Sequence, residues 1–115
     1  MRRGEVRWVD LGSVRGSEAD RRRSAVILSN DGANAAAARL NRGVVTVVPI
    51  TTNTTQVYSF QVLLPAGTAG LHTESKAQAE QVRSVSVHRV STALGMLSPA
   101  LMDQLDDALR LHLSL

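Results

Sequence analysis

The sequence contains no cysteine, which excludes disulfide bonds and thiolate metal ligands. No apolar run approaches the ~18 residues that a membrane-crossing helix needs. The basic N-terminus has no apolar segment behind its charges, so we expect no signal peptide. These absences predict a cytoplasmic protein without membrane attachment. The length of 115 residues predicts a single domain over residues 1–115.

Aromatic residues are scarce, at 3% of the chain, and are limited to Trp8, Tyr58 and Phe60. Proteins that bind single-stranded nucleic acids usually stack bases on such side chains. Side chains alternate between the two faces of a strand, and this alternation can bury all three aromatic residues. We therefore expect no aromatic stacking platform.

The common catalytic motifs are also missing. His72, His88 and His112 lie far apart and lack the HxH or HExxH spacing of a zinc site, so no metal or other cofactor is expected. His112 lies on the apolar side of a predicted helix and is expected in the core or an interface. The sequence has no GxSxG nucleophile elbow and no GxxxxGK[ST] phosphate loop.

The net charge of +3 is unevenly distributed. Residues 1–57 hold nine arginines and five acidic residues, whereas residues 58–115 hold four basic and five acidic residues. Twelve of the 13 basic residues are arginine, whose planar fork binds phosphate bidentately. A GC-rich genome that encodes basic residues as arginine explains this bias equally well. Two readings of Arg21, Arg22 and Arg23 stay open: a solvated surface patch, or a polyanion-binding site such as that of a nuclease.

Hydrophobic patterning predicts a mainly β or α+β domain, with a small, strongly curved sheet or barrel and a C-terminal helix. Ser98 and Pro99 suit the N-cap and first turn of that helix. Pro49 is expected at a sheet edge or bulge, because it cannot donate to a strand ladder. The strand over 58–64 is expected to return as a hairpin. The other predicted elements are strands over 5–11, 24–29, 43–51 and about 76–90, a short helix within 30–43, and a helix over 98–115.

Several sequence blocks occur in a specific order between Arg3 and about Leu113: RRGEVRWVDL, GSE, RRSAVILSND, VVTVVPIT and AEQVRSV. In this combination the chain resembles the MazF/PemK toxins of bacterial toxin–antitoxin pairs, particularly the mycobacterial members. The resemblance implies a small SH3-like barrel of the CcdB/PemK type that works as a homodimer. It also implies a metal-independent, sequence-specific endoribonuclease that cleaves single-stranded RNA to 2′,3′-cyclic phosphate and 5′-hydroxyl ends.

The resemblance also implies roles for individual residues. Arg23 stands where the family has its proposed acid/base and phosphate contact, and Thr51 matches the threonine that orients the scissile phosphate. Arg21 and Arg22 are expected to attract phosphates without sequence preference. The other implied RNA contacts are Gly16, Ser17 and Glu18 in the GSE block, Thr52 beside Thr51, and Glu80, Gln81, Arg83 and Ser84 in AEQVRS.

The chain departs from the family pattern at two positions. Family members commonly have proline after the catalytic arginine, where this chain has Ser24, and some carry histidine where Ser17 stands. Arginine transfers protons poorly because its pKa exceeds ~12. Two mechanisms therefore stay open: Arg23 moves the proton, or Arg23 stabilises the phosphorane while Thr51 or water moves it.

A basic groove for RNA would also accept a MazE-like antitoxin, whose acidic, flexible segment folds on binding. The apolar stripe of the C-terminal helix is a candidate contributor to the homodimer. One alternative is a CcdB-like gyrase poison, but such chains end in a tryptophan-containing segment and this one ends in LRLHLSL. The other alternative is a non-catalytic RNA-binding barrel, which would bind RNA and leave it intact.

Overall fold

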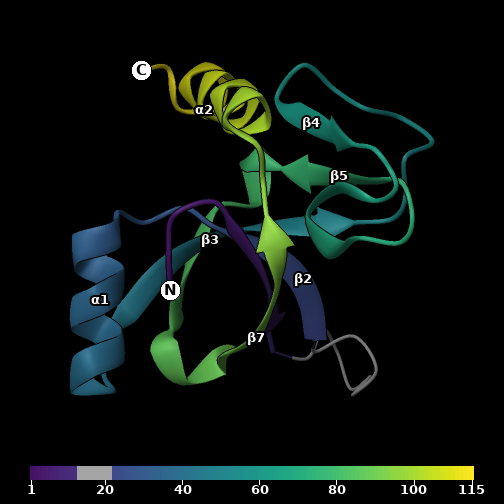
Figure 1. Ribbon diagram of the computed structural model, residues 1–115. Helices are drawn as coiled ribbons and strands as arrows, with labels where there is room; N and C mark the ends of the chain where they lie inside the picture. Colours follow the sequence, from purple (N-terminus) through teal and green to yellow (C-terminus); the bar gives the residue numbers. More distant parts are fainter. Residues whose placement is uncertain (13–21) are drawn as a thin grey trace.

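The computed structural model describes residues 1–12 and 22–115. Within these ranges, seven strands form one antiparallel sheet in the order β4-β5-β3-β2-β1-β7, and β6 pairs with β3 as well. Helix α2 lies over β4 at one end of the molecule, and α1 lies beside β3 (Figure 1). The strands are β1 (Glu5–Asp10), β2 (Arg22–Ile27), β3 (Val44–Thr51), β4 (Gln61–Leu64), β5 (Ser75–Gln78), β6 (Arg83–Ser86) and β7 (Val90–Met96); the helices are α1 (Asp31–Leu40) and α2 (Pro99–Leu113), with 3-10 turns η2 (Thr68–Gly70), η3 (Ala79–Gln81) and η4 (Val87–Arg89).

Strand β3 lies in the interior of the sheet, and its run of β-branched residues forms a strand as predicted. One edge pairs with β2. The other edge pairs with β6 up to Val47 and with β5 from Ile50 onward. Pro49 lies between these two pairings, opposite Ala25. It therefore marks an interruption along one edge of a central strand, rather than an outer edge of the sheet.

The two faces of the sheet carry two separate hydrophobic clusters. Val26 belongs to the cluster under α2, whereas its neighbour Ile27 belongs to the cluster on the side of α1. Both are fully buried, and each such side chain contributes about 1.5–3 kcal/mol. Strand β2 thus presents alternate residues to opposite faces. Because of this alternation, Arg22 and Arg23 at the start of β2 point to opposite faces of the sheet.

Helix α1 forms because both of its ends are capped. The Asn30 side chain accepts a hydrogen bond from the Ala33 backbone, and Asn41 ends the helix in the left-handed conformation (φ 51°). Asn34 is fully buried and donates through Nδ2 to the Ser29 carbonyl at 2.8 Å. The helix is longer than the turn or two expected from the sequence.

Helix α2 begins as predicted, with the Ser98 hydroxyl accepting from the Leu101 backbone and proline in the first turn. Its buried stripe packs on the protein's own core through Leu105, Ala108 and Leu109. The Arg3 guanidinium pairs with Asp106 at 2.6 Å and fixes the helix to the start of β1. No helix in the described ranges is long and apolar enough to cross a membrane.

Two expectations about the strands are wrong, and one strand was missed. The segment at 58–64 contains β4, which pairs with β5 and not with β3, so it is not a hairpin return of β3. The stretch at 76–90 is not one strand, because the turn η3 divides it into β5 and β6. Strand β7 was not predicted; its residues are mostly exposed or half-buried, so it has no strong apolar pattern.

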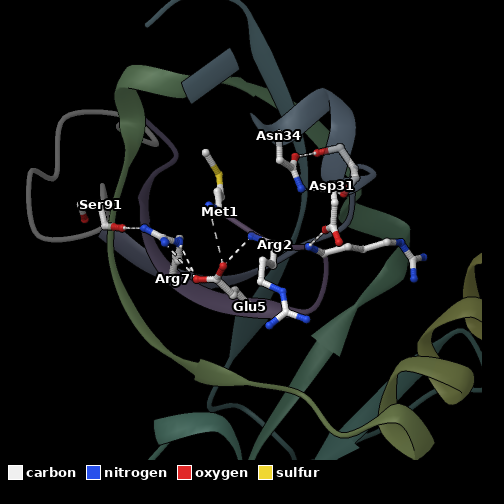
Figure 2. Close-up of polar contacts among 9 residues, drawn as sticks. Met1, Arg2, Glu5, Arg7, Asp31, Asn34 and Ser91 are labelled. Carbon is white, nitrogen blue, oxygen red and sulfur yellow. Dashed lines mark hydrogen bonds and ion pairs between the residues drawn. The ribbon is translucent and has the colours of Figure 1, made fainter. Parts of the chain in front are cut away.

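The start of β1 is held by a group of polar contacts around Glu5 (Figure 2). Its carboxylate accepts from the Arg2 backbone and pairs with the Arg7 guanidinium at 2.9 Å. Arg7 in turn donates through Nη1 to the Ser91 carbonyl at 2.9 Å. These contacts connect β1 to β7 through side chains as well as through the ladder.

Candidate functional site

Arg23 and Thr51 lie on the same face of the sheet, on neighbouring strands. Ala25 of β2 pairs with Pro49 of β3, and Arg23 and Thr51 each lie two residues beyond this last pair, where Thr51 pairs with Lys76 of β5. Directly opposed residues of an antiparallel pair point to the same side. The two residues that the sequence singles out for chemistry therefore share one face at one end of the β2–β3 pair.

A hollow of about 160 Å³ opens on this face. Arg23 lines it from β2 and Arg83 from β6, and Gln81 lines it from the turn η3 between β5 and β6. The remaining lining residues are Leu11, Gly12, Pro49 and Gln78. Three of the predicted site residues therefore meet in one concave surface.

The hollow carries positive charge. Arg23 and Arg83 are both exposed, and Arg83 donates through Nη1 to the Leu11 carbonyl at 3.3 Å. Within residues 1–12 and 22–115, neither guanidinium forms an ion pair with a carboxylate. Two arginines in one hollow, beside the amide of Gln81, suit the binding of a phosphate.

Thr51 ends β3 with its side chain engaged locally. Its Oγ1 accepts a hydrogen bond from the Asn53 backbone at 3.2 Å, and its backbone pairs with Lys76 of β5. A hydroxyl that accepts in this way still has its own hydrogen to donate. Thr51 is half-buried, so the hydroxyl is held in one place at the strand end.

Glu80 lies apart from the hollow that Gln81 lines, although the two are adjacent in η3. Its Oε2 accepts a hydrogen bond from Gln61 Nε2 at 2.7 Å. Its Oε1 is buried, and no hydrogen-bond partner for it is found among the described residues. Gln61 is itself buried and also accepts from the Tyr58 backbone. The structure thus places Glu80 in a polar contact between η3 and β4.

Arg22 and Thr52 lie on the side of the sheet opposite Arg23. The Arg22 guanidinium is 5.5 Å from the centre of the Trp8 ring. Thr52 lines a second hollow, of about 350 Å³, together with Trp8 and Ser24. Trp8 is 36% exposed and Tyr58 48% exposed, so the expectation that strand alternation buries all three aromatic residues is wrong.

The remaining predicted RNA contacts and His112 lie away from the two hollows or outside the described residues. Ser84 is exposed on β6 and pairs with Thr46 of β3. His112 is exposed near the end of α2, with its ring centroid 6.4 Å from that of Phe60, so the expectation of a core position is wrong. No group of three His, Asp or Glu side chains in residues 1–12 and 22–115 is arranged to hold a metal ion. Four predicted RNA contacts lie outside the described residues: Gly16, Ser17, Glu18 and Arg21.

Sequence reasoning missed most of the residues that line the two hollows, including Pro49, Gln78 and Trp8. Pro49 and Gln78 line the hollow of Arg23, and Trp8 lines the larger one. Pro49 gave a signal, since a proline inside a β-branched run marks a break in the ladder. For Trp8, alternation places Val6 on the same face, and Val6 is buried in the core. The alternating pattern of the sequence does not show that the core covers Val6 and stops before Trp8.

The chain matches a family model described as PemK-like, MazF-like toxin of type II toxin–antitoxin system, over residues 2–113. It is 57% identical over 115 residues to endoribonuclease MazF9 of Mycobacterium tuberculosis, which covers all of this chain and 98% of the relative. It is also 65% identical to the probable endoribonuclease MazF1 of M. tuberculosis over 57 residues, which are 50% of this chain and 61% of the relative.

Solved structures share the fold. An endoribonuclease from Mycobacterial species, in complex with its cognate antitoxin, superposes with a TM-score of 0.79 at 23% identity, over 100% of this chain and 96% of that one. MazF from Deinococcus radiodurans superposes with a TM-score of 0.78 at 23% identity, over 100% and 97% of the two chains. At this level of identity the similarity concerns the architecture of the sheet and helices.

Proposed function

Since the chain belongs to the PemK-like, MazF-like toxins of type II toxin–antitoxin systems, we propose that this endoribonuclease cleaves single-stranded RNA at a short sequence motif without a metal ion. The products are a 2′,3′-cyclic phosphate and a 5′-hydroxyl end. The observation that supports this most directly is the hollow in which Arg23, Gln81 and Arg83 meet, with Thr51 on the same face.

In this reaction the ribose 2′-oxygen forms a bond to phosphorus and the bond to the 5′-oxygen breaks. The 2′-hydroxyl gives up a proton, and the departing 5′-oxygen receives one. The phosphorane between these steps carries extra negative charge on its oxygens. Arg23 stabilises that charge through the planar fork of N–H donors on its guanidinium. Such stabilisation is stronger in a preorganised site than in water. The Thr51 hydroxyl donates to a phosphate oxygen and orients the group.

Arg23 acts as a cation and hydrogen-bond donor, while the protons move through Thr51 or water. Guanidinium has a pKa above ~12, so it rarely gives up a proton near neutral pH. Within the described residues the hollow is lined by no carboxylate and no imidazole that would serve as the base. Catalysis at this site thus depends mainly on positioning and charge stabilisation.

The same hollow also suits the partner of a toxin–antitoxin pair. An acidic antitoxin segment would place carboxylates on Arg23 and Arg83 and exclude the RNA phosphate. We also propose a homodimer. Helix α2 buries its main stripe in its own core, so we assign the contact with a second copy to the exposed leucines at and just beyond its end, Leu111, Leu113 and Leu115.

The test uses purified protein, EDTA and a pool of randomised single-stranded RNA, with the 5′-hydroxyl ends mapped by sequencing. Arg23→Ala is measured beside Arg39→Ala, which also removes one exposed arginine but lies on α1 and does not line the hollow. We expect cuts at one short motif with the wild type and Arg39→Ala, and none with Arg23→Ala.

Other outcomes distinguish the alternatives. RNA that is bound with a steep salt dependence but stays intact indicates a non-catalytic RNA-binding barrel. Folded protein that neither binds nor cleaves RNA, but inhibits DNA supercoiling by gyrase, indicates a gyrase poison. Cleavage that needs added divalent ions contradicts the metal-independent mechanism.

A further inference from the structure

Trp8 lies on the same face of β1 as Val6, beyond the point where the core ends. In the pairing of β1 with β7, the register shifts on both sides of Arg7, between Val6 and Arg7 and again before Val9. The indole is 36% exposed while Val6 and Val9 are fully buried. A large, rigid aromatic surface therefore faces solvent at the start of β2.

The hollow beside Trp8 is lined by groups that can recognise a planar polar ligand. Its volume of about 350 Å³ is in the range of small-molecule sites. Ser24, Thr52 and Thr73 contribute hydroxyls, and His72 contributes an imidazole. Leu71 and Leu94 supply apolar contact. A rigid aromatic platform with nearby donors and acceptors is the arrangement that proteins use to bind an unstacked nucleobase.

The far wall of this hollow is held in place by two glycines. A Cβ on Gly70 would lie 2.2 Å from the Leu94 carbonyl oxygen, and a Cβ on Gly95 would lie 2.5 Å from the Ala69 carbonyl carbon. The backbones of η2 and β7 are thus in direct contact. Gly70 also has a φ of +80°, which favours glycine. The wall opposite Trp8 is therefore built by close backbone packing.

Arg22 lies on a different side of the indole from this hollow. Its guanidinium is 5.5 Å from the Trp8 ring centre, and Trp8 and Arg22 line a separate depression. Arg22 is not among the residues that line the hollow with Ser24 and Thr52. A ligand can therefore reach Trp8 while the Arg22 guanidinium stays over the indole ring. A negative group on that ligand would have Arg22 as a nearby positive partner.

We propose that Trp8 stacks on a nucleobase next to the scissile phosphate, with the hollow of Ser24 and Thr52 reading its edge. This proposal rests on the proposed function, because it places one base of the RNA substrate beside the proposed cleavage site. Alternate residues of β2 point to opposite faces, so Arg23 engages the phosphate on one face while the base is bound on the other. A nucleotide splayed at that point satisfies both contacts.

Ser24 makes this subsite a determinant of the cleaved motif. Its side chain lines the hollow, and its position follows Arg23 directly. A hydroxyl there can donate to or accept from a base edge, whereas the ring of a proline offers neither. Ser24→Pro is expected to alter the base that is preferred beside the cut.

Trp8 is the only tryptophan, so its fluorescence reports on this site alone. We would titrate wild-type protein with the RNA motif found in the pool experiment, synthesised with one 2′-deoxyribose at the cut so that it binds without reacting. RNA binding is followed in parallel by the anisotropy of a label on the RNA. We expect saturable quenching of Trp8 with the same Kd as the anisotropy change.

A series of RNAs with one abasic position each then locates the stacked base. One position next to the cut is expected to abolish the quenching and weaken binding by about 5- to 150-fold, as for the loss of one stacked base. This measurement needs no protein variant, so a folding defect cannot imitate it. Trp8→Phe should retain most of the affinity and Trp8→Ala should lose it, whereas Tyr58→Ala, an exposed aromatic outside the hollow, should change little.

Several results would overturn the proposal. RNA that binds while Trp8 fluorescence stays constant, or an abasic series without a position-specific effect, shows that no base stacks there. A signal that changes with protein concentration alone assigns Trp8 to a contact between copies, and quenching by an acidic antitoxin peptide but not by RNA assigns it to that partner. If the wild type leaves all-ribose RNA intact, the proposed function itself fails, whatever the fluorescence shows.

Discussion

Arg23 and Arg83 line the same hollow although they come from β2 and β6, two strands that do not pair with each other. Both strands pair with β3, one on each edge, and this places the arginines on either side of it. Two cations held by one central strand need no flexible loop to meet. The sheet therefore fixes the backbone positions of both arginines, which is what the proposed phosphate site requires.

Arg23→Lys separates charge from geometry at this site. Lysine keeps the positive charge but loses the planar fork, so we expect cleavage to fall substantially and yet stay above that of Arg23→Ala. Removing one preorganised donor from a transition-state site costs roughly 10²- to 10³-fold in rate. Single-turnover cleavage at saturating enzyme measures this directly. Equal activity of Arg23→Lys and the wild type would show that the fork is not needed.

Arg22→Ala is expected to weaken RNA binding without abolishing cleavage at saturating protein. Each phosphate neutralised by a cation contributes about −0.7 to the slope of log affinity against log salt for single strands. The variant should therefore show a shallower slope by roughly that amount. The measurement is the Kd of the 2′-deoxy RNA between low and physiological salt. A parallel shift with an unchanged slope would contradict the assigned phosphate contact.

Glu80→Ala is expected to act on stability. Its carboxylate accepts from the buried Gln61 amide at 2.7 Å, and alanine leaves that donor without a partner. An unsatisfied buried polar group costs about 1–3 kcal/mol. Urea unfolding followed by circular dichroism gives this value, and Glu80→Gln, which keeps an acceptor oxygen, should recover much of it. A changed cleavage motif with unchanged stability would instead support the RNA contact that the family resemblance implies.

Asn34→Ala should destabilise the fold while leaving the hollow intact. Asn34 is fully buried, donates to the Ser29 carbonyl and accepts from the Ser29 hydroxyl, so it joins α1 to the end of β2. Its loss leaves two polar groups without partners, and we expect about 1–3 kcal/mol less stability. Exposed Ala38 on the same helix offers a control in Ala38→Ser, for which thermal unfolding should barely change.

Local signals in the sequence predicted the helices well. Ser98 and Pro99 specify the start of α2 through hydrogen bonding and fixed backbone geometry within one turn, and these interactions need no distant partner. The β-branched run of β3 likewise identifies a strand from its own composition. Such features depend on neighbours in the chain and are therefore readable without a structure.

Pairings between distant segments were not readable in the same way. Strand β4 pairs with β5 because the chain between them turns back. The residues of β4 do not indicate which strand it pairs with. The same limit applies to the site. The family resemblance pointed to Arg23, Gln81 and Arg83, but only the register around β3 brings them into one hollow and sends Arg22, Thr52 and Trp8 to the other face.

The alternation along the start of β2 also bears on how specificity relates to cleavage. Arg23 lines one hollow, and its neighbour Ser24 lines the hollow beside Trp8. A substitution at residue 24 therefore changes a different surface from the one that Arg23 occupies. Under the proposed function, the base beside the cut and the cleavage reaction would be set by side chains on opposite faces of one strand, so that a change in one need not alter the other.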